Sequence, residues 1–124
     1  MKRGFTLIEL LITIIILGIL VTIVAPKYTV MVEKARADQA ITYLRVMRTG
    51  EKIYYASNTR YVACASALPI RENLGVEITE ESYLFSITSS VPTTFLATAI
   101  RKKNNTTITL DQDGTWGGTS SYRP

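Results

Sequence analysis

The sequence has no histidine and only one cysteine, Cys64, among its 124 residues. A Ser/His or Cys/His nucleophile pair therefore cannot be built, and zinc sites that need histidine or several cysteines are excluded. Any catalysis would have to use carboxylates, lysine or tyrosine, and no pattern of these indicates a substrate. The sequence predicts neither an enzyme nor a cofactor, and we expect the lone thiol to be a small buried side chain.

A strong charge bias is also missing. The chain has 14 basic and 10 acidic residues, a formal net charge of +4, and Lys2 and Arg3 supply two of the positive charges. Proteins that bind nucleic acid usually carry a clearer basic patch. Arg101-Lys102-Lys103 could contact phosphates, but three charges at a hairpin tip are more typical of a solvated turn. Nucleic acid is therefore not the expected partner.

Charge is almost absent from the start of the chain, where Glu9 is the only ionisable side chain between Phe5 and Ala25. A helix over this run would be about 31 Å long, which matches the hydrocarbon core of a bilayer. The run is longer than the apolar part of a cleaved secretory signal, and no small-x-small site follows it. Lys2 and Arg3 favour a cytoplasmic N-terminus. We expect a retained membrane-spanning helix with the remainder of the chain outside.

Glu9 does not suit a simple membrane anchor, because an acidic side chain inside a membrane helix costs about 2.5 to 3.5 kcal/mol. One explanation is local, since Thr6-Leu7-Ile8-Glu9 matches a capping box and an acid in the first turn complements the helix dipole. The other is that Glu9 pairs with a cation of another chain, such as a free N-terminal amine. The two explanations are compatible.

The stretch Gly4-Phe5-Thr6-Leu7-Ile8-Glu9 resembles the class III signal of type IV prepilins and pseudopilins. The resemblance implies that a membrane peptidase cuts after Gly4, so that Met1 to Gly4 is a leader. It further implies N-methylation of the new first residue, Phe5. By the same resemblance, Glu9 neutralises the Phe5 amine of a neighbouring subunit during assembly.

The resemblance continues at Gly18 and Pro26, where pilins of this type carry a glycine and a proline. Pro26 cannot donate a backbone hydrogen bond to Thr22, and Gly18 adds about 0.5 to 1 kcal/mol of helix cost relative to alanine. The resemblance implies that residues 18–26 extend or melt when the subunit leaves the membrane. The alternative is an ordinary proline kink.

The chain becomes amphipathic from Lys27, and one helix is expected to continue to about Ala56. Its apolar stripe should cover a small sheet, while the apolar half before it protrudes. The residues expected in the stripe are Val30, Ala37, Ala40, Leu44, Met47 and Tyr54. The residues expected on the remaining surface are Glu33, Lys34, Arg36, Asp38, Arg45, Arg48, Glu51 and Lys52.

The rest of the chain predicts a long loop followed by an antiparallel sheet of about three to four strands. The loop runs to Ser82, with a short helical turn near residues 66–73 and a stop at Gly75. Strands are expected over residues 83–88, 94–100 and 106–110, with a short fourth one at Thr115-Trp116. The predicted fold class is therefore α+β, a long helix packed on a small sheet, as in pilins.

Three segments follow from this division of the chain: a leader over residues 1–4, a hydrophobic segment over 5–26 and a globular head over 27–124. Asp111-Gln112-Asp113-Gly114 in the head partly matches a calcium loop. Asp111 and Asp113 are weak calcium candidates, because the third ligand position and the distal glutamate of an EF-hand are missing. A β-turn is the favoured interpretation, and no metal is expected.

The resemblance implies a structural subunit of a type IV pilus-like filament, held in the bacterial inner membrane as a precursor and then found in an extracellular fibre. Its partners would be identical or related subunits, the prepilin peptidase, the inner-membrane assembly machinery and, before assembly, lipid. One alternative is a type II secretion pseudopilin. Another is a single-pass membrane protein with a small external binding domain. Motility, adhesion and DNA uptake are not separated by the sequence.

Overall fold

The computed structural model describes residues 3–124, in two compact units that divide between Ala35 and Arg36. The long helix α1 spans Leu7–Asn58 and contributes to both units. Met1 and Lys2, the first half of the expected leader, lie outside the described residues. The predicted helix end near Ala56 is correct to within two residues.

The first unit consists of the chain up to Ala35 and is helical from Leu7 onward. The helix continues through Gly18 and Pro26, and every apolar side chain from Phe5 to Met31 is exposed. By length and composition, α1 contains a stretch long and apolar enough to cross a membrane. This unit therefore has apolar surface that none of its own residues covers.

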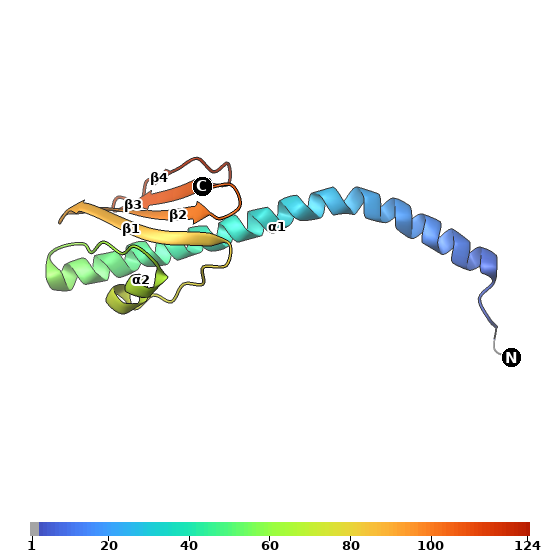
Figure 1. The fold of residues 1–124 in the computed structure, drawn as a ribbon, viewed down its shortest axis with the longest axis horizontal. Coiled ribbons are helices and arrows are strands. Elements are labelled where there is room, and N and C mark those ends of the chain that lie inside the picture. Colours follow the sequence, from blue (N-terminus) through green and yellow to red (C-terminus); the bar gives the residue numbers. More distant parts are fainter. Residues whose placement is uncertain (1–2) are drawn as a thin grey trace. The chain divides into compact units, whose positions relative to one another are not determined.

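The second unit, Arg36–Pro124, contains a four-stranded antiparallel sheet with strand order β1-β2-β3-β4 (Figure 1). The strands are β1 (Tyr83–Val91), β2 (Thr94–Arg101), β3 (Thr107–Asp111) and β4 (Trp116–Gly117). Short connections join neighbouring strands, which is why the sheet is antiparallel throughout. The predicted α+β class and strand number are confirmed.

The core of this unit lies between one face of the sheet and the second half of α1. Alternate residues of each strand point inward, so that Phe85, Ala97 and Ile108 are buried. Tyr43 of α1 meets Phe85 edge to face with ring centroids 5.5 Å apart. The buried positions of α1 are Ala37, Ala40, Ile41, Leu44, Met47, Gly50 and Glu51. The predicted stripe is confirmed from Ala37 to Met47, whereas Val30 is exposed.

The loop between α1 and β1 contains the helix α2 (Ala67–Leu74), close to the predicted helical turn. Ser66 precedes it with extended backbone, and Gly75 ends it in the left-handed conformation that glycine adopts at low cost. Cys64 pairs with Ile87 of β1 through two backbone hydrogen bonds. Its side chain is buried, as expected, and burial raises the pKa of the Cys64 thiol to about 11, with nearby Glu51 adding to the effect.

Glu51 is placed wrongly by the sequence prediction, which put it on the solvated face of the helix. Its side chain is 0% exposed. Oε2 accepts the Val62 N–H at 3.1 Å, and Oε1 has no hydrogen-bond partner among residues 3–124. The position follows from helical spacing, because Glu51 stands seven residues after Leu44 and four after Met47. Burial raises the pKa of this carboxyl to about 6, and the Val62 bond partly opposes the shift.

Replacing this carboxylate, Glu51→Gln, is expected to remove a pH-dependent loss of stability. The native pKa is about 6 against an ordinary value of 4.5, so folding favours the protonated form. The stabilisation is complete below the ordinary value and is lost as pH rises through about 6. The loss is about 2 kcal/mol of unfolding free energy.

Thermal unfolding of the full chain in detergent at about pH 4 and about pH 8 measures this loss. The exposed Glu77→Gln serves as the control and should keep the native pH dependence. If Glu51→Gln shows the same pH dependence as the native chain, burial does not perturb this carboxyl.

Candidate assembly site at the start of the helix

Glu9 and Thr6 form a reciprocal pair at the first turn of α1. The Thr6 N–H and Thr6 hydroxyl both donate to Glu9 Oε2 at 2.8 Å, and the Glu9 N–H donates to the Thr6 hydroxyl at 3.3 Å. This is the predicted capping box. Within residues 3–124 both bonds to the carboxylate end on Oε2, so Oε1 is left to accept from another group. The capping role of Glu9 is thus confirmed, and it uses only one of the two carboxylate oxygens.

The residues of the predicted cleavage site lie beside this carboxylate. Arg3, Gly4, Phe5 and Glu9 line one open pocket at the start of the chain. Gly4 and Phe5 precede α1 and are not helical, and the Phe5 side chain is 85% exposed. An exposed backbone outside a helix or strand is the form in which a peptidase reaches a peptide bond. The cleavage and methylation of this site remain predictions.

The segment from Gly18 to Pro26 is helical in this structure. The Thr22 hydroxyl donates to the Ile19 carbonyl at 2.7 Å, and the Thr29 hydroxyl donates to the Pro26 carbonyl at 2.9 Å. Pro26 leaves the Thr22 carbonyl without its usual backbone donor, and neither of these hydroxyls bonds to that carbonyl. The structure shows residues 18–26 as part of α1. The melting of this segment on leaving the membrane stays a prediction.

Two weaker candidates of the sequence serve the head's own structure. Asp111 Oδ1 accepts the backbone N–H groups of Asp113 and Thr115 at 2.9 and 2.8 Å, which is the turn favoured above. Within residues 3–124, no group of three or more acidic, cysteine or histidine side chains is placed to hold a metal ion.

The predicted solvated tip at Arg101-Lys102-Lys103 needs a correction. Arg101 is buried, donates to the Ser82 carbonyl at 2.7 Å and lies over the ring of Tyr83. Lys102 Nζ bonds to the Glu80 carbonyl. Arg101 and Lys102 therefore hold the loop before β1, while Lys102 and Lys103 are both exposed, as predicted for the tip.

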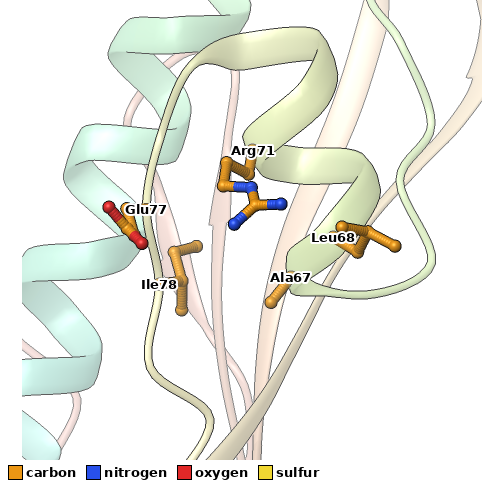
Figure 2. Close-up of a pocket in the computed structure, with 5 residues that line it drawn as sticks. All are labelled: Ala67, Leu68, Arg71, Glu77 and Ile78. Carbon is orange, nitrogen blue, oxygen red and sulfur yellow. The ribbon is translucent and has the colours of Figure 1, made fainter.

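The head also has a shallow pocket beside α2, shown in Figure 2. Ala67, Leu68 and Arg71 come from α2, and Glu77 and Ile78 come from the segment after it. One guanidinium and one carboxylate among apolar side chains provide neither a nucleophile nor a metal site. We therefore place the candidate functional site at the start of α1 and not at this pocket.

Comparison with known proteins agrees with the geometry of the first turn. Residues 1–25 match the family described as the prokaryotic N-terminal methylation motif. The chain is 37% identical over 60 residues to the type IV major pilin protein PilA of Myxococcus xanthus. It is 35% identical over 60 residues to the type II secretion system core protein G of Dickeya chrysanthemi. The chain is thus similar to type IV pilins and to pseudopilins, most clearly at its start. The motif and the apolar helix fit a membrane-anchored precursor.

A third relative extends the similarity into the head. The type IV wide pilus major component PilA4 of Thermus thermophilus is 33% identical over 88 residues, which cover 71% of this chain and 65% of that protein. The matches to the other two cover 48% of this chain, but only 27% and 39% of those relatives. The chain thus aligns with less than two thirds of the length of each relative. No solved structure matches it significantly.

Proposed function

We propose that this chain is a structural, non-catalytic subunit of a type IV pilus-like filament that assembles by helix packing. The observation that carries the proposal is an acidic side chain, Glu9, in the first turn of a helix whose following residues are apolar and exposed. In a membrane span alone this acid would serve only as a helix cap, which gives no further reason to retain a group whose insertion is unfavourable. A filament in which the acid meets a cation gives one.

Cleavage after Gly4 would create that cation, because it turns the Phe5 nitrogen from a peptide group into an amine. The amine of one subunit would then approach Glu9 of a neighbour among apolar helices, where an unpaired charge is expensive. Oε1 of Glu9 is the oxygen left to receive it, since Thr6 occupies Oε2. N-methylation of Phe5 keeps the amine basic and adds apolar surface.

The same apolar surface would serve two environments in turn. In the inner membrane it faces lipid, with the N-terminus cytoplasmic and the head on the outer side. In the filament it faces the helices of other subunits. Gly18 and Pro26 weaken the helix between these contacts, and a local extension there would let one sequence fit both. The peptidase and the inner-membrane machinery are the partners that this path requires.

A second candidate is a pseudopilin of a type II secretion system, since one of the relatives described above carries that name. The head favours the pilus, because the turn at Asp111 to Thr115 is closed by its own hydrogen bonds and is short. Resemblance to a major pseudopilin would imply a long calcium-linked loop near the C-terminus, and the described residues form only this short turn there. A single-pass membrane protein with a small binding domain is the third candidate, and it accounts for Glu9 only as a helix cap.

The proposed function predicts that the chain is recovered in fibres sheared from the cell surface. Shearing should move most of the chain into the extracellular pellet, and micrographs should show long filaments that an antibody to the head decorates. A type II pseudopilus predicts retention with the cell envelope instead. If the chain stays entirely in the membrane fraction as a monomer, the filament proposal is wrong.

A further inference from the structure

Glu51 is a buried carboxyl of the head that filament assembly by helix packing does not use. It faces the stretch of chain between α1 and α2, and we call residues 62–66 of this stretch the connecting segment. Oε2 accepts the Val62 N–H at 3.1 Å, whereas Oε1 is buried and has no hydrogen-bond partner within residues 3–124. A negative charge on this side chain would leave Oε1 without the donors that a buried charge needs. Ionisation is therefore unfavourable while the connecting segment is in place.

The titratable groups around Glu51 do not compensate this charge. They are Arg48 and Tyr55 of α1, Tyr61 and Cys64 of the chain after it, and Asp113 of the turn after β3. The Arg48 guanidinium donates to the Gln112 carbonyl at 3.1 and 3.2 Å instead. Burial is the main cause that raises the pKa of the Tyr61 hydroxyl and of the Cys64 thiol, so both stay neutral between about pH 4 and pH 8. The buried group of this cluster that changes its charge in that range is Glu51.

The connecting segment is attached to the head less firmly than the chain on either side of it. Before it, the ring of Tyr61 packs against the rings of Tyr55 and Phe95, with centroids 4.6 and 4.7 Å apart. After it, the chain enters α2. Within the segment, Cys64 is buried and exchanges two backbone hydrogen bonds with Ile87 of β1. A short stretch with so few contacts opens at a lower cost in free energy than the domain as a whole.

An ionised Glu51 can reach water in two ways. Unfolding of the whole head would hydrate it but would lose the entire core. Opening of the connecting segment alone breaks the bond from Val62 and the two bonds between Cys64 and Ile87, and it leaves the sheet and α1 in place. The second way is cheaper. We propose that Glu51 is a pH-sensitive switch for the connecting segment, which stays closed when the carboxyl is protonated and opens more often when it is ionised.

The size of the effect follows from the two protonation equilibria. The pKa of Glu51 is about 6 in the closed head, and in the open head it returns to the ordinary value of 4.5 because water reaches both oxygens. The closed form is therefore most stable below the ordinary value and loses stability as pH rises through about 6. Opening should become about 20- to 30-fold more frequent between about pH 4 and about pH 8. It exposes the Cys64 thiol and frees the N–H and carbonyl of Ile87 at the edge of β1.

Cys64 reports on this opening because it is the only cysteine of the chain. The full chain in detergent is labelled with dithiodipyridine, a thiol reagent that also reacts in acid, and its rate is divided by that of a peptide of the connecting segment at the same pH. This ratio should rise about 20- to 30-fold from about pH 4 to about pH 8 in the native chain and in the exposed control Glu77→Gln. It should stay constant in Glu51→Gln. A native ratio that does not change with pH, or an unchanged rise in Glu51→Gln, would overturn the proposal.

Hydrogen exchange followed by mass spectrometry separates local opening from unfolding of the head, and it needs neither the thiol nor filaments. After correction for the intrinsic effect of pH, peptides of the connecting segment should lose protection as pH rises, while those of β2 and β3 keep theirs. If all strands lose protection together, the head unfolds as a whole and the switch is wrong. Glu51→Met, which has an apolar end and no titratable group, should keep the segment protected at both pH values and replaces Glu51→Gln if that variant does not fold.

Discussion

Filaments are expected to disappear when Glu9 is replaced by glutamine, while the precursor still inserts in the membrane. The variant keeps the size of the side chain and a carbonyl oxygen for Thr6, so the first turn should remain helical. It loses the negative charge that neutralises the Phe5 amine of a neighbour. An unpaired charge among apolar helices costs about 3 to 5 kcal/mol, which weakens each contact by more than about 100-fold.

Quantitative blotting of sheared fibres measures filament formation, and blotting of membranes measures insertion of the precursor. The exposed Glu72→Gln on α2 makes the same chemical change elsewhere and should leave fibres at native yield. Insertion of Glu9→Gln should be as good as native or better, because a costly acid has been removed. A native fibre yield from Glu9→Gln would show that Glu9 is only a helix cap.

Shortening Leu44 to alanine is expected to produce the largest loss of stability in the head. Leu44 is 0% exposed at the centre of the stripe that α1 packs on the sheet. Removing a buried leucine side chain costs about 2 to 5 kcal/mol, a large share of the 5 to 15 kcal/mol that stabilises a typical domain. The expected decrease in melting temperature is about 10 to 20 °C for a head of this size.

Circular dichroism of the full chain in detergent follows this melting. Ile53→Ala is the matched control on the same helix, since Ile53 is 66% exposed, and it should change the stability by less than about 0.5 kcal/mol. Equal shifts for the two variants would mean that α1 does not pack on the sheet through Leu44.

The sequence predicted the parts of this protein that rest on local patterns. The apolar run, the capping box at Thr6 and Glu9, the end of α1 and the strands depend on spacing along the chain, and the structure has them within a few residues. The start motif was equally local, and the family comparison agrees with it over residues 1–25.

The errors concern side chains whose surroundings come from distant segments. Glu51 and Arg101 are charged and were expected in solvent, but each is buried by contacts with another part of the chain. Glu51 accepts from Val62, and Arg101 reaches the Ser82 carbonyl and the ring of Tyr83. Charge alone predicts exposure, and only tertiary packing supplies the partners that make burial tolerable.

The N-terminal peptide of the subunit in sheared fibres tests the central claim most directly. Mass spectrometry should find that the chain in fibres begins at Phe5 and carries one added methyl group on its amine. The membrane fraction should hold some precursor that still includes Gly4. A chain that is found only in membranes and retains Met1 to Gly4 would contradict the account, because no amine would then exist for Glu9 to neutralise.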